Sequence, residues 1–244
     1  MSSSRKRLFF DIETSLIQGL FFSIGRKISL SPQNIVKESG IICIAWKWAG
    51  KREVHHLEWD KNQCEKKMLL EFMKVMNEAD EIVAHNGDKF DIAWIRTICA
   101  KYEIPMPPTY QSIDTLKKCR SLFRFHSNRL DYVAKFFGLE RKGKTQFQWW
   151  VDITLNNCQA TMAKMVKYCK RDVRVLEKVF DRLNPYMPHR TALSKDAREC
   201  PECGGRRVKA NHILSAAGVE KYNMYCKHGC GKYQVVAASK VKEK

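Results

Sequence analysis

Five side chains have the types and spacing that metal-dependent chemistry needs. Asp11 and Glu13 stand two positions apart at the end of an apolar run, Asp91 follows a second apolar segment, and Tyr168 precedes Asp172 by four positions. Alternate residues of a strand share a face, as do residues four apart on a helix. Converging carboxylates repel one another unless a cation lies between them, and their oxygens suit hard divalent ions. The spacing therefore indicates a divalent-metal site.

The elements that must position these side chains alternate in type, which indicates an α/β domain. Periodicity predicts strands at 7–12, 41–48, 53–57, 81–84 and 113–115, and helices at 60–79, 88–102, 116–123, 130–137 and 158–183. The aperiodic stretch 15–40 predicts a long loop with a short helix from Ser31. Asp88 is expected to cap the helix whose first turn holds Asp91. Active sites in such sheets favour the carboxyl ends of parallel strands, where Asp91 would lie.

Three motifs in chain order carry a family resemblance. They are Asp11-Ile12-Glu13, then Asn86 with Phe90-Asp91, then Tyr168-x-x-x-Asp172. Together they resemble the DEDD 3′→5′ exonucleases, the DnaQ-like branch of the ribonuclease H-like fold. The resemblance implies a mixed five-stranded sheet flanked by helices.

The third motif indicates the subtype. Tyr168 stands where the tyrosine subtype, DEDDy, carries its tyrosine, whereas Lys167 stands where the histidine subtype carries its histidine. Segment 128–139 looks like the helix that such domains carry between the second and third motifs. The chain is thus similar to the proofreading domains of family B DNA polymerases over roughly residues 7–185.

The resemblance implies a role for each motif residue. Asp11 would bridge two Mg²⁺ or Mn²⁺ ions about 4 Å apart, with Glu13 and Asp172 completing one site and Asp91 helping to hold the other. One ion would activate a water and the other would stabilise the departing 3′ oxygen, so that the product is a nucleoside 5′-monophosphate. Tyr168 would orient the attacking water, because a phenol with a pKa of about 10 is a poor base at neutral pH.

Substrate contacts are expected around these motifs. Asn86 would position substrate or the second motif's loop, with a turn cap as the alternative. Phe21 and Phe22 would stack on the terminal base, or else pack in the core. Between Ser112 and Trp150, nine Lys and Arg residues stand against three acids, which favours a phosphate-binding face over an ordinary solvated surface. The residues expected to bind phosphate there are Arg124, Arg129 and Lys144.

The ten cysteines fall into two groups. Six are scattered singly among apolar or helical neighbours and are interpreted as buried free thiols. The other four form two close pairs, each followed by glycine, with 22 residues between the pairs: Cys200, Cys203, Cys226 and Cys230. This stretch looks like a zinc ribbon, in which two knuckles present thiolates to a structural Zn²⁺. His228 is an alternative to Cys230 as the fourth ligand, and strands are expected at 208–213, 221–225 and 232–236.

Length and charge bound the remaining possibilities. The 244 residues suit an exonuclease domain at 1–189, a linker at 190–197 and a zinc ribbon at 198–244. A net charge of +18 favours nucleic acid as the partner, with an anionic membrane surface second. Neither a membrane span nor a secretory signal is evident in the sequence. The cysteine pairs suit a reducing compartment, so a cytoplasmic protein is expected. A resemblance to small stand-alone exonucleases implies a bacterial or phage-infected cell.

These observations favour a free-standing, metal-dependent 3′→5′ exonuclease that acts on DNA, because no polymerase domain fits in 244 residues. The ribbon would bind nucleic acid or a replication or repair protein, and the domain pair resembles small stand-alone exonucleases of phages and bacteria. One alternative is an exoribonuclease or RNA-processing nuclease, since the 2′-OH would be sensed away from the metals. The other is a catalytically idle nucleic-acid-binding adaptor, against which the intact motif set argues.

Overall fold

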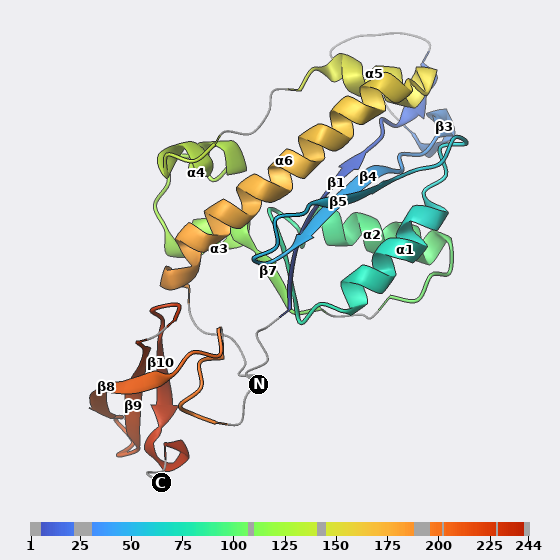
Figure 1. Ribbon diagram of the computed structural model, residues 1–244. Helices are drawn as coiled ribbons and strands as arrows, with labels where there is room; N and C mark the ends of the chain where they lie inside the picture. The colour runs from blue at the N-terminus through green and yellow to red at the C-terminus, as the bar shows by residue number, and fades with distance from the viewer. Residues whose placement is uncertain are drawn as a thin grey trace.

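The computed structural model describes residues 6–21, 31–106, 110–140, 145–187, 196–201, 203–227 and 229–241. An α/β body comes first along the chain, and a small three-stranded sheet follows it (Figure 1). Among the described residues, no helix is long and apolar enough to cross a membrane.

The body is built on a mixed five-stranded sheet with the strand order β5-β4-β1-β6-β7. The antiparallel part joins β1 to β4 and β4 to β5, and the parallel part joins β1 to β6 and β6 to β7. The strands span Arg7–Thr14 (β1), Ile41–Trp48 (β4), His55–Glu58 (β5), Glu81–Ala84 (β6) and Ser112–Asp114 (β7). The expected mixed five-stranded α/β architecture is therefore confirmed.

Six α-helices are present among the described residues of the body. They are α1 (Lys66–Asn77), α2 (Asp91–Lys101), α3 (Thr115–Leu122), α4 (Leu130–Phe136), α5 (Phe147–Asn156) and α6 (Gln159–Leu183), which continues into the 3-10 turn η2 (Asn184–Tyr186). Five were expected, whereas α5 was not. Its sequence is rich in aromatic and β-branched residues, which are weak helix formers, so packing must stabilise it.

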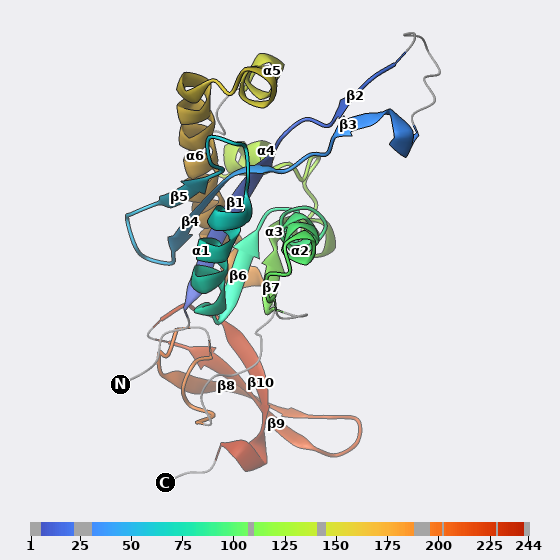
Figure 2. The ribbon, with the colours of Figure 1, turned by 90° about the vertical axis from the view of Figure 1, so that its right-hand side faces the viewer.

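Each face of the sheet carries its own core, because the side chains of β1 alternate between the two faces. Phe9 points toward α6, where its ring centroid lies 5.3 Å from that of Phe180. Phe10 points into the opposite layer, which α1 and α2 cover (Figures 1 and 2). Since alternate residues share a face, Asp11 and Glu13 lie on the α6 side, with Phe9.

The stretch after β1 is more ordered than a simple loop. A short hairpin joins β2 (Gln18–Gly19) to β3 (Ile35–Lys37), and the 3-10 turn η1 (Pro32–Asn34) lies just before β3. The expected short helix from Ser31 is thus present as a 3-10 turn. Figure 2 shows the hairpin projecting from the body beyond the end of β1.

The C-terminal sheet has the order β10-β9-β8, with both pairs antiparallel. Its strands are β8 (Arg207–Leu214), β9 (Glu220–Cys226) and β10 (Tyr233–Ala237), and the 3-10 turn η3 (Ala238–Lys240) follows them. The three strands lie within one or two residues of their expected positions. Most of the expected linker, up to residue 195, falls outside the described residues.

Candidate metal centre and its surroundings

β1 and α6 bring three carboxylates to one point. One carboxylate oxygen from each of Asp11, Glu13 and Asp172 lies within 4.8 Å of the others. The pairing of β1 with β4 shifts register between Glu13 and Thr14, so the strand bends just after the second carboxylate. α6 supplies Asp172, which is 1% exposed, from its buried face. The strand spacing predicted that Asp11 and Glu13 share a face, whereas the family resemblance alone implied that Asp172 joins them.

The electrostatics of this cluster suit a divalent cation. Carboxylates at such separations repel one another, and the burial of Asp172 adds a desolvation cost to its ionised form. A bound cation offsets both costs, and an all-oxygen donor set matches hard ions such as Mg²⁺ and Mn²⁺. The residues of the cluster therefore fit the metals that the motif pattern implies.

Asp91 stands next to this group rather than within it. It is the first residue of α2 and is buried, and its Oδ1 accepts a hydrogen bond of 3.1 Å from the backbone N–H of Ile12. Ile12 lies between the two acidic residues of β1. The structure thus brings three of the four expected carboxylates together and fixes the fourth to the backbone between two of them.

Tyr168 and its neighbour Cys169 lie, like Asp172, on the buried face of α6. Tyr168 lies one turn before Asp172 and is 8% exposed. The Cys169 thiol lies 3.3 Å from the backbone oxygen of Asp11 and 3.5 Å from its Oδ2. Burial, and then contact with the Cys43 thiol, raises the pKa of the Cys169 thiol well above its usual value, so the thiol stays protonated and donates. The sequence predicted a buried thiol here but not its contact with Asp11.

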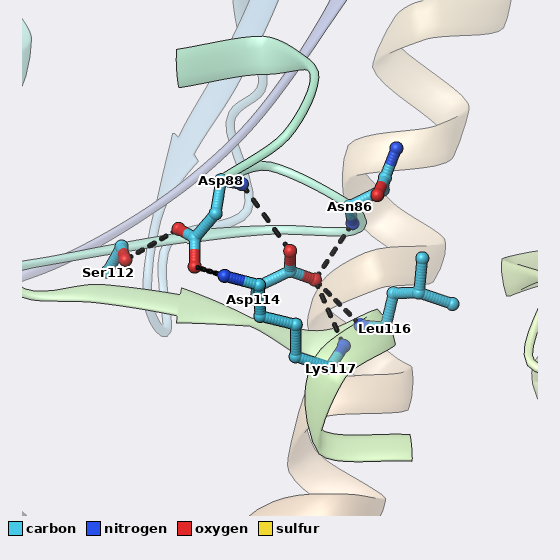
Figure 3. A network of polar contacts seen from close by, with 6 residues as sticks. All are labelled: Asn86, Asp88, Ser112, Asp114, Leu116 and Lys117. Atoms are coloured by element: carbon cyan, nitrogen blue, oxygen red, sulfur yellow. Dashed lines mark hydrogen bonds and ion pairs between the residues drawn. The ribbon is translucent and has the colours of Figure 1, made fainter. Parts of the chain in front are cut away.

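The loop of the second motif is held by Asp114, which the sequence analysis did not single out. Its Oδ1 accepts from the backbone N–H groups of Asn86 at 3.0 Å, Leu116 at 2.9 Å and Lys117 at 3.2 Å. Its Oδ2 accepts from the N–H of Asp88 at 3.4 Å (Figure 3). Asp114 therefore caps α3 and ties that helix to the turn after β6. Asn86 occupies that turn with φ of 70°, a conformation that Asn tolerates better than most residues.

The expectation that Asp88 caps α2 is wrong. α2 begins three residues later, at Asp91, and the residue before it, Phe90, makes no side-chain cap. Asp88 instead accepts hydrogen bonds of 2.7 Å from Ser112 Oγ and from Lys117 Nζ (Figure 3). The left-handed turn at Asn86 delays the helix, so the Asp88 side chain meets β7 and α3.

A polar cavity of about 620 Å³ opens beside the second motif. Its lining includes Asn86, Arg120, His126 and Arg129. His85 also lines it and contacts Thr115 Oγ1 at 2.8 Å and the backbone oxygen of Asn128 at 3.0 Å. Of the expected phosphate-binding residues, Arg129 lines this cavity, Arg124 is exposed on the connection between α3 and α4, and Lys144 lies outside the described residues.

A second, apolar cavity of about 760 Å³ lies between the β2–β3 hairpin and α5. Phe21 lines it together with Leu16, Ile35 and Leu155. Because Phe21 is 50% exposed, core packing does not describe its position. Phe22 falls outside the described residues.

The cysteine quartet forms the second metal-ligand cluster. Sulfur atoms of Cys200, Cys203, Cys226 and Cys230 all lie within 4.8 Å of one another, and the Cys200–Cys230 and Cys203–Cys226 pairs are each 3.6 Å apart. Burial, followed by the Cys203 contact, raises the pKa of the Cys226 thiol to about 11. Four converging thiols fit the tetrahedral sulfur site that Zn²⁺ prefers. Cys230 belongs to this cluster, whereas His228 lies outside the described residues.

Comparison with known proteins places this architecture in a family. The sequence profile of the RNase H superfamily matches residues 33–184, more than half of the chain. The match includes Asp91, Tyr168 and Asp172 and begins after Asp11 and Glu13.

DNA polymerases of archaea are among the similar proteins. The chain is 33% identical over 144 residues to a DNA polymerase of Thermococcus hydrothermalis, an alignment that covers 58% of this chain and 7% of that protein. It is 34% identical over 104 residues to a DNA polymerase of Pyrococcus glycovorans, covering 42% of this chain and 12% of that protein. The aligned part is thus a small fraction of these relatives.

A solved structure gives the same result at the level of the fold. The family B DNA polymerase from the hyperthermophilic archaeon Pyrobaculum calidifontis superimposes with a TM-score of 0.56 at 18% identity, covering 74% of this chain and 25% of the polymerase. With the five-stranded mixed sheet and the matched profile, the protein belongs to the RNase H superfamily.

Proposed function

We propose that the protein is a metal-dependent 3′→5′ exonuclease of the DEDDy subtype, which hydrolyses DNA to nucleoside 5′-monophosphates. The convergence of Asp11, Glu13 and Asp172 is the observation that carries this proposal. Similarity to DNA polymerases supports DNA as the substrate, and membership of the RNase H superfamily supports phosphodiester hydrolysis. The catalytic domain is assigned to residues 1–189.

The residues of the site have two proposed roles, which are to hold metal ions and to position the substrate. Asp11, Glu13 and Asp172 would hold two Mg²⁺ or Mn²⁺ ions, with Asp91 fixed beside them through the Ile12 N–H. Bound divalent ions of this kind lower the pKa of a water and stabilise charge on a phosphate and its leaving oxygen. The protein's part is to place the scissile phosphate against this cluster.

Tyr168 and the two cavities would position the substrate. Tyr168 lies one helical turn from Asp172, from which its hydroxyl orients the attacking water. The polar cavity with Asn86 and Arg129 suits backbone phosphates of the strand that enters the site. The apolar cavity with Phe21 suits the face of the terminal base. Phe22, Arg124 and Lys144 are assigned as further contacts to the same nucleic-acid strand on sequence grounds alone.

The C-terminal segment 198–244 is assigned as a zinc ribbon that follows a linker at 190–197. Its four clustered cysteines would hold one structural Zn²⁺. The segment has ten Lys and Arg residues against four Asp and Glu, so nucleic acid is the favoured partner, and a replication or repair protein is the alternative.

Gel-resolved digestion of matched 5′-labelled oligonucleotides tests the proposal. Single-stranded DNA, duplex DNA and RNA are each incubated with Mg²⁺ or Mn²⁺ and with wild type, Asp11→Ala or the control Glu58→Ala, which removes an exposed carboxylate from β5. We expect a ladder that shortens from the 3′ end of DNA with wild type and Glu58→Ala, and none with Asp11→Ala. Preferential shortening of RNA would instead make the protein an exoribonuclease. Binding without cleavage under either metal would leave only an adaptor role.

A further inference from the structure

The C-terminal sheet has two unlike faces, which its register fixes. Val208, Tyr225 and Tyr233 lie directly opposite one another across the three strands. Directly paired residues share a face, and so do alternate residues along a strand. The same face therefore also carries Lys221 and Asn223 of β9 and Val235 of β10. We call the six residues Val208, Lys221, Asn223, Tyr225, Tyr233 and Val235 the tyrosine face.

The tyrosine face exposes apolar side chains on both of its outer strands, β8 and β10. Tyr233 is 56% exposed, Val235 52% and Val208 38%, which is unusual for apolar side chains grouped on one side of a small sheet. The rings of Tyr225 and Tyr233 lie against each other, with centroids 4.7 Å apart and planes inclined by 33°. Together they form a two-ring surface across β9 and β10.

On the opposite side of the sheet the centre is occupied by contacts within the chain, whereas Leu214 at the end of β8 is 66% exposed. Met224 is 1% exposed there. Tyr222 lies on this side too, with Lys209 Nζ 4.3 Å from its ring centroid and the His212 ring 5.4 Å away. Each side thus carries a tyrosine of β9, but the Tyr222 ring already contacts Lys209 and His212, whereas Tyr225 lies against the exposed Tyr233.

Charge and ring chemistry together identify the occupant. Segment 198–244 carries ten basic residues against four acidic ones, so a polyanion complements it better than a typical protein surface does. Stacked aromatic rings with nearby cations bind the bases of single strands without sequence preference. In a duplex the bases are stacked on one another, so their flat surfaces are not available to the tyrosine rings. The phosphates of a duplex need cations, whereas the centre of the tyrosine face offers rings and aliphatic groups.

We propose that the tyrosine face binds single-stranded nucleic acid, with unpaired bases stacking on Tyr225 and Tyr233 and the backbone lying along Lys221. The proposal rests on the proposed nuclease function and names the partner of the ribbon. Long single strands then have a second contact with the protein in addition to the metal centre, and very short ones do not.

The test compares two tyrosines of one sheet that lie on opposite faces. Tyr233→Ala and the matched control Tyr222→Ala are titrated against a fluorescent 30-nucleotide single strand and against its duplex, without Mg²⁺, Mn²⁺ or chelator so that zinc is retained. We expect Tyr233→Ala to weaken single-strand binding about tenfold, while Tyr222→Ala and duplex binding change less than twofold. Zinc content of one ion per chain in both variants shows that the ribbon is folded. Equal losses in the two variants, or no loss in either, would overturn the proposal.

An abasic strand separates stacking from other effects. When the bases are removed, wild type and Tyr233→Ala should bind the strand equally, because the group that the tyrosine contacts is gone. A tenfold difference that persists on the abasic strand would rule out base stacking. Both readouts are of binding, so they stand even if no cleavage is found. Tyr233→Ala should cleave a trinucleotide as fast as wild type does, because so short a strand does not reach the tyrosine face. If wild type itself does not cleave the trinucleotide, that result counts against the nuclease proposal and leaves the binding proposal unaffected.

Discussion

The Cys169 thiol contacts Asp11, one of the three carboxylates of the proposed metal centre. It lies 3.5 Å from Asp11 Oδ2 and 3.3 Å from the Asp11 backbone oxygen, and it is fully buried. Groups that donate hydrogen bonds to metal ligands fix the orientation of those ligands and tune their affinity. Cys169 is thus a positioning residue for Asp11.

Replacing Cys169 should change the metal requirement of the site. We expect Cys169→Ala to raise the Mg²⁺ concentration for half-maximal cleavage about tenfold, because Asp11 loses a donor that orients it. Cys169→Ser, which keeps a donor, should recover most of that loss. Mg²⁺ titrations of cleavage rate measure both effects.

Cys99→Ala serves as the control, because it also removes a buried thiol from the body but lies on α2 in the other core layer. An equal shift in Cys99→Ala, or no advantage of serine over alanine at position 169, would mean that the effect is only one of packing.

At the scale of elements, Asp114 joins three pieces of chain that the site needs. It links the end of β7 to the first turn of α3 and to the turn after β6. That turn leads directly into α2, whose first residue is Asp91. By holding this turn, the carboxylate of Asp114 helps to determine the position of Asp91 at the start of α2.

Asp114→Asn should lower both stability and activity. An amide nitrogen cannot accept, so some of the four N–H donors lose their partner, at a cost of about 1–3 kcal/mol in the free energy of unfolding. Urea denaturation measures this cost, and the cleavage rate per folded molecule should fall because Asn86 and Asp91 are displaced. Asp131→Asn, an exposed acid in the first turn of α4, should change stability by less than about 0.5 kcal/mol. Equal effects of the two substitutions on the free energy of unfolding would contradict the role of Asp114 in holding this turn.

The sequence predicted those elements whose side chains repeat with a clear period. One such element is α6, which holds Tyr168 and Asp172. Its regular apolar face predicted where the helix lies in the sequence and that those two residues share a face. α5 and the β2–β3 hairpin were missed because their segments are short or irregular and are stabilised by packing against distant residues, such as the contact of Leu16 N–H with Thr154 Oγ1. Asp114 was missed for a related reason. It ends a three-residue strand, and its two partners in the turn after β6 lie 28 and 26 residues away in the sequence.

At the scale of the whole molecule, two metal-ligand clusters of opposite chemistry lie in one chain. The carboxylates of the body suit hard cations, and the four clustered thiols of the C-terminal segment suit Zn²⁺. A sheet as small as β8–β10 has little core of its own, so metal binding and folding should be coupled there.

Zinc affinity of the ribbon should rise with pH. The pKa of the Cys226 thiol is raised to about 11, and that of Cys230 is raised by its contact with Cys200 and by burial, so these metal-free thiols are protonated at pH 7. Zinc must displace those protons, and each proton released makes the apparent affinity rise about tenfold per pH unit. Competition titrations with a chromophoric chelator at pH 6.5 and 7.5 measure the change. Cys99→Ser should behave as wild type, Cys203→Ser should bind far more weakly, and a pH-independent affinity would contradict thiol ligation.

The contact between Cys169 and Asp11 joins residues that are 158 positions apart in the sequence. A ribosome therefore finishes β1 long before it makes α6, and the emerging chain holds only two of the three converging acids for most of its synthesis. No nascent intermediate that lacks α6 can assemble the cluster, however well its sheet has formed. The order of the chain thus delays completion of the carboxylate cluster until α6 has been made.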